Sequence, residues 1–403
     1  MADIRFFNTY EPVSPFYRDL LPFLSDRGLK VEVIVSSREY REGRRPLEES
    51  LAPSGVRVRR IGWSNEPVQR RSQKLLVMVT YLVGAVLLSL FGPRAQLNFF
   101  LTQPPLFSSW GILLRAFRRQ PYCCLVMDVY PDLAVRDGIL KENGLATRLL
   151  AKVSGIVLRR ADAVIVIGRC MREQLEKIGV APARLELVQN WVNDAEVWAV
   201  DHERNRLRDE LGLGGKFVIL YSGNMGVSHS FSDVLEAARR LKELPDIVFL
   251  FIGDGSRRKE ISEWQQRFGL ENVRLLPFQP NERLAESLSL GDVHFLSLRA
   301  GFEGLAVPSK AYGALAAGRP ILYQGESTGE IARMVLEEEI GCVVPLDDPD
   351  TLVTAVRRYY EDRSLGVEQG MRALRLNQLK YGRDQALEKY SQILEALVRR
   401  VPS

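Results

Sequence analysis

A lysine follows a glycine-rich segment in the second half of the chain, within the stretch AGFEGLAVPSKAYGALAAGRP at residues 300–320. Pro308 suits the first turn of a helix, so the pattern places Ser309 and Lys310 near the positive end of that helix. A lysine there adds to the positive end of the helix dipole unless an anion compensates it. The stretch therefore favours an anion-binding site over a solvent-facing lysine.

Three turns that follow predicted strands in the same half contain glycines, at residues 222–226, 253–256 and 301–304. Glycine lets a phosphate approach the backbone closely. Three such turns in one predicted domain favour a phosphate-bearing ligand over turns that serve geometry alone. His229 follows the first turn and precedes a predicted helix, so we place it in the site, whereas His202 and His294 have structural explanations.

Several other chemistries lack their sequence patterns. No G-x-x-x-x-G-K-[ST] occurs and the first predicted strand does not lead into GxGxxG, which argues against P-loop hydrolysis and nicotinamide chemistry. The acidic residues Asp347, Asp348 and Asp350 precede a predicted helix and are better explained as its N-terminal cap than as metal ligands. The net charge is +5, but no aromatic-interleaved basic motif for nucleic acid is present. We expect no metal, no cofactor and no nucleic-acid partner.

Apolar, strand-like runs alternate with helical segments along the whole chain. This alternation predicts an α/β fold with mostly parallel sheets covered on both faces. A length of 403 residues exceeds the roughly 250 to 300 residues at which a single core stops growing, so we expect two doubly wound domains. The runs begin at Ile4, Val31, Val56, Leu97, Tyr122, Ala163 and Leu185, and then at Lys216, Asp246, Val273, Asp292, Pro320 and Cys342.

One uncharged run, residues 75–92, is eighteen residues long and flanked by Arg71, Lys74 and Arg94. This length is at the lower edge for a membrane span. A span here would put the strands of one predicted sheet on opposite sides of a bilayer. We therefore expect a buried or interfacial helix whose basic flanks face the inner membrane surface. The N-terminus lacks the pattern of a cleavable signal, so a cytoplasmic, peripherally membrane-associated protein is expected.

The ordered motifs of the chain resemble those of the retaining nucleotide-sugar glycosyltransferases of family 4, over nearly the whole length. They are YSGNMG, FIGDGS, LPFQP and SLRAGFEGLAVPSKAYGALAAGRP in the second half, and MDVYPDLAV and RRADAVIVIGRCMREQL in the first. The resemblance is closest to the branch that includes bacterial fucosamine and fucose transferases of surface-polysaccharide assembly. It implies a GT-B fold, in which two Rossmann-like domains face a central cleft and the C-terminal helix crosses back to the first domain.

This resemblance divides the chain into residues 1–195 with the returning helix 383–403, which would bind the acceptor, and residues 196–382, which would bind the donor. The donor would be a UDP- or GDP-sugar and the acceptor lipid-linked or a polysaccharide. Lys310 would offset the charge of the leaving diphosphate, and Phe278 and Gln279 would lie beside the nucleobase. The expected donor-binding residues are Gly223, Asn224, Gly226, Gly253, Asp254, Phe278, Gln279, Glu303, Gly304, Leu305, Ala306 and Ser309, of which residues 304–306 would offer backbone to the diphosphate or sugar.

In the first domain, Asp128 stands where the family usually carries a histidine. It is expected to orient or deprotonate the acceptor hydroxyl, or alternatively to cap the next turn. Asp128 completes a catalytic set with Lys310 and His229, and the expected acceptor side comprises Tyr10, Arg18 and Tyr130.

Many family members carry two glutamates where this chain has Gly301 and Ser309, so the roles of that pair are not carried over. Two alternatives to the transferase therefore stay open. One is a nucleotide-sugar epimerase on the same fold, and the other is a catalytically inert partner subunit.

Overall fold

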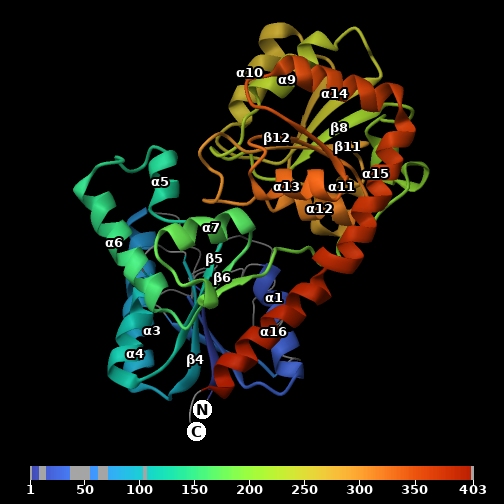
Figure 1. The fold of residues 1–403 in the computed structure, drawn as a ribbon. Coiled ribbons are helices and arrows are strands. Elements are labelled where there is room, and N and C mark those ends of the chain that lie inside the picture. Colours follow the sequence, from blue (N-terminus) through green and yellow to red (C-terminus); the bar gives the residue numbers. More distant parts are fainter. Residues whose placement is uncertain (1, 9–14, 37–54, 62–70, 103–106, 401–403) are drawn as a thin grey trace. The chain divides into compact units, whose positions relative to one another are not determined.

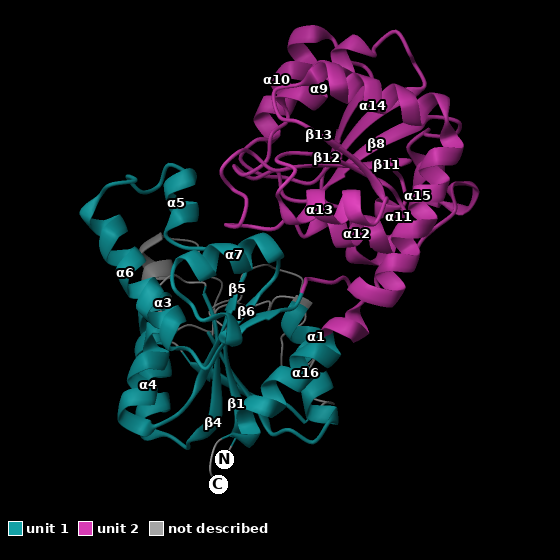
Figure 2. Cartoon of the chain, viewed as in Figure 1, with its two compact units in different colours: residues 1–188, 387–403 teal, residues 189–386 magenta. Residues whose placement is uncertain are grey.

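The computed structural model describes residues 2–8, 15–36, 55–61, 71–102 and 107–400 of the chain. They form two compact units, one made of residues 1–188 and 387–403 and the other of residues 189–386 (Figure 2). The sequence placed these boundaries at 195 and 383. The C-terminal helix thus returns to the first unit.

A parallel sheet of seven strands forms the centre of the first unit, in the order β3-β2-β1-β4-β5-β6-β7. All seven runs predicted for this half are strands. Every residue of β2 and β5 is buried, as expected for a parallel sheet with helices on both faces. The strands are β1 (Ala2–Asn8), β2 (Val31–Ser36), β3 (Arg57–Ile61), β4 (Ala95–Leu101), β5 (Tyr122–Val126), β6 (Ala163–Val166) and β7 (Leu185–Leu187).

Helices cover both faces of this sheet, with α3, α4 and α6 along one side and α1 and α16 along the other (Figure 1). The C-terminal helix packs on α1, where the rings of Phe16 and Tyr390 meet edge to face with centroids 5.0 Å apart. The helices are α1 (Pro15–Asp26), α3 (Arg71–Phe91), α4 (Trp110–Arg118), α5 (Asp132–Arg136), α6 (Leu145–Arg160), α7 (Arg169–Lys177) and α16 (Arg383–Arg399).

The apolar run at residues 75–92 forms most of α3 and lies on the sheet. Tyr81 of its inner face donates a hydrogen bond to the Ile34 carbonyl at 3.3 Å. At Gly84 a side chain would begin 2.1 Å from the Ile61 side chain, so glycine permits the close packing of α3 on β3. Within the described ranges, every helix is too short or too polar to cross a bilayer.

The sheet of the second unit has six parallel strands in the order β10-β9-β8-β11-β12-β13. All six runs predicted for this half are strands. The strand order reverses between β8 and β11, and in sheets of this kind ligands bind at the carboxyl ends of the strands beside such a reversal. The strands are β8 (Phe217–Ser222), β9 (Ile247–Ile252), β10 (Val273–Leu276), β11 (Val293–Ser297), β12 (Ile321–Gln324) and β13 (Gly341–Val344).

Side chains alternate between two cores along β8. Phe217, Ile219 and Tyr221 pack with residues of α9 and α14, whereas Val218 and Leu220 pack with α8 on the other face. The α-helices are α8 (Arg206–Glu210), α9 (Ser232–Arg240), α10 (Arg258–Phe268), α11 (Leu284–Leu288), α12 (Lys310–Ala316), α13 (Glu330–Glu337), α14 (Pro349–Glu361) and α15 (Arg363–Leu376).

Short connecting turns complete the described elements. Single 3-10 turns lie at Phe107–Ser109, Pro182–Arg184, His202–Arg204 and Asn281–Arg283, and a π-helical turn lies at Asn377–Tyr381.

The acidic cluster before α14 acts as a helix cap. Asp348 is the N-cap, and its carboxylate accepts hydrogen bonds from the Thr351 amide at 2.9 Å and the Thr351 hydroxyl at 2.6 Å. These bonds satisfy a backbone donor that the first turn of a helix leaves free. The prediction of a cap is confirmed.

Candidate functional site

Lys310 and His229 are far apart in the sequence, but the pairing of β8 with β11 brings the segments that carry them together. The Lys310 Nζ lies 2.9 Å from the His229 Nε2. Lys310 is the first residue of α12 and Ser309 is its N-cap, so the prediction that Pro308 lies in the first turn is wrong. Pro308 stands one residue before the cap, where the missing N–H of proline takes no hydrogen bond from the helix.

The hydrogen bonds of His229 fix which ring nitrogen carries the proton. Its Nδ1 lies 2.6 Å from the Ser297 carbonyl oxygen. Because a carbonyl can only accept, Nδ1 donates and Nε2 presents its lone pair to Lys310. Burial lowers the pKa of His229 to about 4, and the charge of Lys310 acts in the same direction. The imidazole is therefore neutral at physiological pH and accepts from the Lys310 ammonium.

Lys310 is a largely buried cation without an anionic partner. Burial lowers the pKa of its amine to about 8. No carboxylate of the described residues lies within ion-pair distance of it, and its Nζ is 5.3 Å from the centre of the Tyr221 ring. A charge removed from water is unfavourable unless an opposite charge meets it. The arrangement is therefore suited to receive an anion.

The glycines of the neighbouring turns make room for protein atoms. Gly223 has φ +136°, and a side chain on it would begin 2.6 Å from the Lys310 Cε. A side chain on Gly253 would begin 2.1 Å from the Gly223 carbonyl oxygen, and one on Gly255 would begin 2.5 Å from that of Met225. These glycines are thus required by the packing of the two turns on each other and on Lys310. The charge of Lys310, and not the number of glycines in the turns, therefore indicates an anion-binding site.

The remaining predicted donor residues of the first two turns lie around this packing. Asn224 is exposed and its carbonyl accepts from the Tyr221 hydroxyl at 2.7 Å. The Gly226 carbonyl accepts from the His229 amide at 3.2 Å, and the Asp254 carbonyl accepts from the Met225 amide at 2.8 Å. These bonds fix the turn that carries His229.

Phe278 and Gln279 follow β10 next to these turns. The Phe278 ring lies close to Gly253, since a side chain added at Gly253 would begin 3.3 Å from it, and Phe278 is 49% exposed. Gln279 is half-buried and donates to the Pro277 carbonyl at 3.0 Å. An exposed ring at this edge of the sheet is a surface on which a planar base can stack.

Hydrogen bonds within the loop at residues 301–309 use several of its backbone amides. Glu303 accepts from the Gly301 amide through Oε2 at 2.8 Å, and its buried Oε1 has no hydrogen-bond partner among the described residues. The amides of Leu305 and Ala306 donate to the Phe302 carbonyl at 3.0 and 3.2 Å. These two amides are therefore occupied by the tight turn, and the expectation that residues 304–306 offer backbone to the diphosphate or sugar stays a prediction.

The other two predicted residues of this loop contribute geometry. Gly304 is buried with φ +75°, a conformation that favours glycine. Ser309 is exposed at the N-cap of α12, and its side chain makes no capping hydrogen bond.

Two site residues were missed in the sequence. The Ser297 hydroxyl accepts from the Ser230 amide at 3.1 Å and donates to the Ser230 carbonyl at 2.8 Å. The Arg257 guanidinium donates to the His229 carbonyl at 2.5 Å. Both hold the turn that carries His229. A signal was present in each case, since Ser297 is a polar residue at the carboxyl end of a buried strand and Arg257 directly follows the 253–256 turn.

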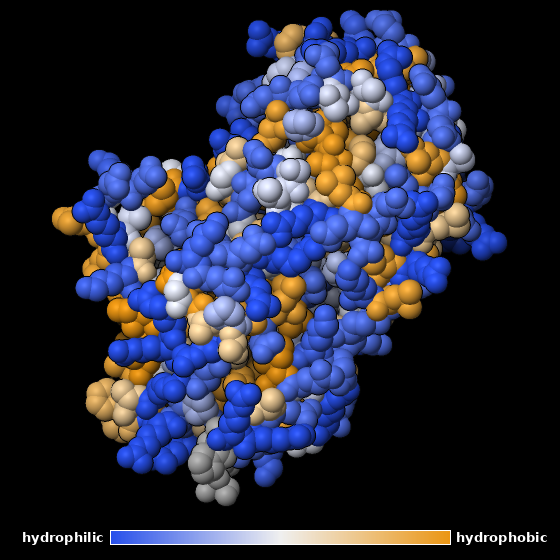
Figure 3. Space-filling model, viewed as in Figure 1, coloured by the Kyte–Doolittle hydropathy of each residue, from blue (hydrophilic) through white to orange (hydrophobic). Residues whose placement is uncertain are grey.

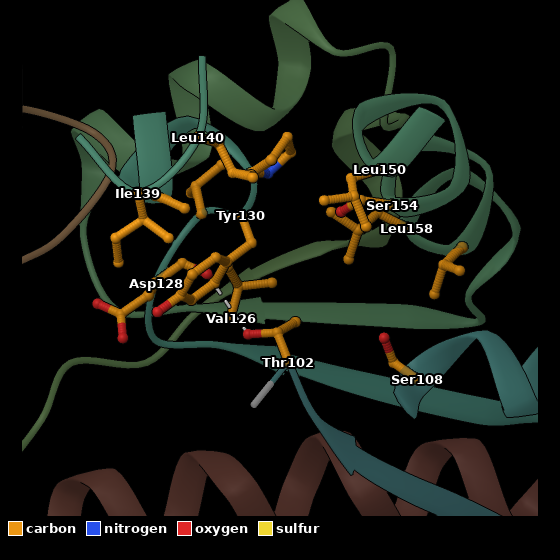
Figure 4. A pocket seen from close by; sticks show the side chains of 14 residues that line it. Thr102, Ser108, Val126, Asp128, Tyr130, Ile139, Leu140, Leu150, Ser154 and Leu158 are labelled. Atoms are coloured by element: carbon orange, nitrogen blue, oxygen red, sulfur yellow. Dashed lines mark hydrogen bonds between the residues drawn. The ribbon is translucent and has the colours of Figure 1, made fainter. Parts of the chain in front are cut away.

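A pocket of about 240 Å³ lies in the first unit, where β4 and β5 end (Figure 4). Asp128 and Tyr130 are on one side of it and Leu150, Ser154 and Leu158 of α6 are on the other. The Thr102 hydroxyl donates to the Asp128 carbonyl at 3.5 Å. Burial, with the nearby charge of Asp128, raises the pKa of Tyr130, so its hydroxyl stays protonated. The lining is mostly apolar, with polar groups from Thr102, Ser108, Asp128, Tyr130 and Ser154.

The structure brings together the predicted catalytic residue Asp128 and one of the three residues predicted for the acceptor side, Tyr130. Arg18 lies on α1 and does not line the pocket, and Tyr10 lies outside the described residues. The N-cap of α5 is Pro131, which makes no side-chain capping hydrogen bond, and Asp128 precedes it by three residues. Both roles considered for Asp128, at the acceptor hydroxyl and as a cap of the next turn, stay predictions.

Two family models match successive halves of the chain. The model "Glycosyl transferase 4-like domain" matches residues 14–191, and "Glycosyl transferases group 1" matches residues 203–377. The chain belongs to the glycosyltransferases. In this glycosyltransferase, the Asp128 pocket lies in the first matched domain and Lys310 lies in the second.

Curated relatives agree with this family. The glycosyltransferase is 31% identical over 255 residues to the probable glycosyltransferase WbjE of Pseudomonas aeruginosa, covering 63% of this chain and 64% of the relative. It is 30% identical over 248 residues to the putative colanic acid biosynthesis glycosyl transferase WcaI of Escherichia coli (strain K12), covering 57% and 60%. The chain thus spans less than two thirds of the length of these relatives.

A solved structure shows the same fold. Anabaena HepE, in complex with UDP-glucose, matches 98% of this chain and 100% of its own with a TM-score of 0.73 and 14% sequence identity. The predicted α/β fold of two Rossmann-like domains, the GT-B fold, is confirmed.

Proposed function

We propose that this glycosyltransferase moves a sugar from a UDP- or GDP-sugar to a lipid-linked or polysaccharide acceptor, with retention of the anomeric configuration. The observation that carries the proposal is Lys310, a largely buried ammonium with a pKa near 8 and no carboxylate partner in the described structure. Negative charge grows on the diphosphate as the bond to the sugar breaks. A fixed cation at that place stabilises the transition state more than the bound substrate.

The second unit supplies the donor contacts in this proposal. His229 accepts from Lys310 and so directs the ammonium. The free Oε1 of Glu303 is placed to accept from a donor hydroxyl, and the exposed Phe278 ring is placed to stack on the base. Because Lys310 provides the positive charge, we propose that turnover needs no metal or cofactor. The resemblance to the fucosamine and fucose transferase branch suggests a deoxyhexose as the donated sugar.

The first unit supplies the acceptor contacts. Asp128 lies beside Tyr130 in a pocket with a mostly apolar lining. We propose that the Asp128 carboxylate orients or deprotonates the acceptor hydroxyl. The name of WcaI, a colanic acid biosynthesis glycosyl transferase, supports a surface-polysaccharide acceptor. The apolar helix α3 and its basic flanks support a protein of the cytoplasm that associates with the inner membrane surface.

Thermal unfolding with a panel of donors tests this function. We expect one of the UDP-, GDP-, ADP- or dTDP-sugars to raise the melting temperature, because a ligand stabilises the folded form that binds it. Product analysis with and without acceptor then separates the alternatives. A changed sugar nucleotide in the absence of acceptor would identify an epimerase, and donor binding without any turnover would identify an inert subunit. Loss of turnover in EDTA would contradict the metal-free reaction.

A further inference from the structure

The outer face of α3 carries an apolar stripe that the fold does not require. Its inner face, with Tyr81, Ala85 and Ser89, is fully buried on the sheet. A helix on the surface of a soluble domain normally presents polar residues to water. On α3 the outward positions are instead large apolar residues at helical spacing, Leu76, Val79, Val83, Leu87 and Phe91, with exposed fractions from 43% to 81%.

Two more helices continue this surface. Arg118 of α4 donates to the carbonyls of Ser89 and Gly92 at 2.7 and 3.0 Å, so the ends of α3 and α4 lie together. Arg115 of α4 donates to the Arg160 carbonyl at the end of α6 at 3.2 Å. The three helices line one side of the first unit, where the space-filling view shows hydrophobic groups among hydrophilic ones (Figures 1 and 3).

The largest exposed apolar side chains of the described structure gather in this region. Leu145, Phe91, Phe117 and Ile139 are the four most exposed, at 86%, 81%, 76% and 74%. They come from α6, α3, α4 and the segment before α6. Large exposed apolar side chains on neighbouring helices are typical of an interaction site.

The ionisable residues of the three helices themselves carry charge of one sign. None of α3, α4 and α6 contains an aspartate or glutamate, although these number 50 in the 403-residue chain. Asp162, just after α6, is paired with Arg115 at 2.6 Å. A negatively charged partner surface is therefore complementary to the charge of these three helices. The described basic side chains of the three helices are Arg115, Arg118, Arg148, Lys152, Arg159 and Arg160.

We infer that the outer faces of α3, α4 and α6, here called the three-helix face, bind the surface of an anionic phospholipid bilayer. The exposed apolar side chains enter the headgroup layer and the basic side chains meet lipid phosphates. This inference rests on the membrane association proposed above and gives it residues and a lipid class. Helix α6 also forms a wall of the pocket that holds Asp128, through Leu150 and Leu158. The bound surface and the acceptor pocket thus share one helix.

Flotation with lipid vesicles tests the three-helix face. The full chain should float with phosphatidylcholine–phosphatidylglycerol vesicles, should stay unbound with phosphatidylcholine alone, and should be released by high salt. R148Q/K152Q should reduce the partition coefficient by about thirty-fold, since each exposed cation near an anionic surface adds about one factor of five. Phe117→Ser should also weaken binding. The matched controls are K242Q/K259Q and Met371→Ser, exposed positions in the second unit, and these should bind vesicles as the parent does.

Nucleotide binding, measured by the thermal shift with UDP, separates this inference from the proposed function. The three-helix variants should keep the UDP shift of the parent. A parent protein that responds to UDP but binds neither vesicle, or binds both equally, would overturn the inference and leave the donor site standing. A dimer in sedimentation that Phe117→Ser dissociates, without vesicle binding, would identify a second copy of the chain as the occupant and would also overturn it. Vesicle binding without any nucleotide response would contradict the proposed donor site instead.

Discussion

The two units share one architecture but carry opposite chemistry at the carboxyl ends of their strands. Both sheets are parallel and have the first strand of the unit in third place in the strand order. The second unit holds Lys310, a cation with no carboxylate partner in the described structure, against a neutral histidine. The first unit holds Asp128 and Tyr130 at the edge of an apolar pocket. The same fold thus presents a positive site in one unit and an acidic, apolar one in the other.

In the function proposed here, the local side chains, and not the shared fold, assign a substrate to each unit. The proposal places the diphosphate beside Lys310 and the acceptor hydroxyl in the pocket with the Asp128 carboxylate. Substitutions of Lys310 in the second unit and of Asp128 in the first should therefore have different effects on donor binding and on transfer to the acceptor.

The largest effect is expected for Lys310→Met, which keeps a long side chain and removes the cation. Turnover should fall by about 10² to 10³, the usual consequence of losing a fixed group that stabilises transition-state charge. The free protein should melt at the same temperature or higher, because an unpaired cation whose pKa is lowered by burial has been removed. Steady-state kinetics and thermal unfolding measure the two outcomes.

Lys259→Met is the matched control for this variant, since Lys259 is a well exposed lysine of the same unit. It should leave turnover unchanged. Normal turnover in the Lys310→Met protein would show that the Lys310 cation has no catalytic role.

Asp128→Asn tests the proposed role of the first unit in acceptor chemistry. Transfer to the acceptor should fall by about 10², at the lower end of what general-base catalysis contributes. UDP-induced stabilisation should not change, because Asp128 lies in the first unit and the proposed donor residues lie in the second. Initial rates and the thermal shift with UDP measure the two quantities. If UDP stabilisation disappeared together with transfer, Asp128 would be a structural residue of the whole fold.

The sequence predicted the two sheets well because every strand is a short apolar run between turn residues, and parallel strands buried on both faces leave that pattern. The candidate site was predicted in part. Lys310 was found through its place near a helix start, but its contact with His229 depends on how β8 and β11 pair, which spacing does not encode. Gly253 was predicted as a donor-binding residue, but the glycine pattern alone did not show that this glycine also packs against the Gly223 carbonyl.

In our interpretation His229 positions the Lys310 ammonium, and a smaller effect is expected for the substitution His229→Asn. The asparagine amide can still donate to the Ser297 carbonyl, as Nδ1 does, but nothing replaces Nε2 as the acceptor for Lys310. Turnover should fall by at least about tenfold, since a hydrogen bond that involves a charged group contributes about 1.5 to 3 kcal/mol. His229→Gln, whose side chain reaches further, should recover part of the rate. Equal losses in both variants would indicate that the imidazole is needed only for folding of the turn.

The smallest effect is expected for the pH dependence of UDP binding, which we attribute to the titration of Lys310 in the second unit. Burial lowers the pKa of Lys310 to about 8 in the free protein, and a bound diphosphate would raise it again by favouring the ammonium. Affinity should therefore be constant below pH 8 and fall as the pH rises above it, by about tenfold between pH 7 and pH 9. The terminal phosphate of UDP does not contribute in this range, because its second pKa is about 6. Isothermal titration with Lys310→Arg as the control decides the assignment, since arginine stays charged and its profile should be flat. The same decline in the arginine variant would attribute the titration to a different group.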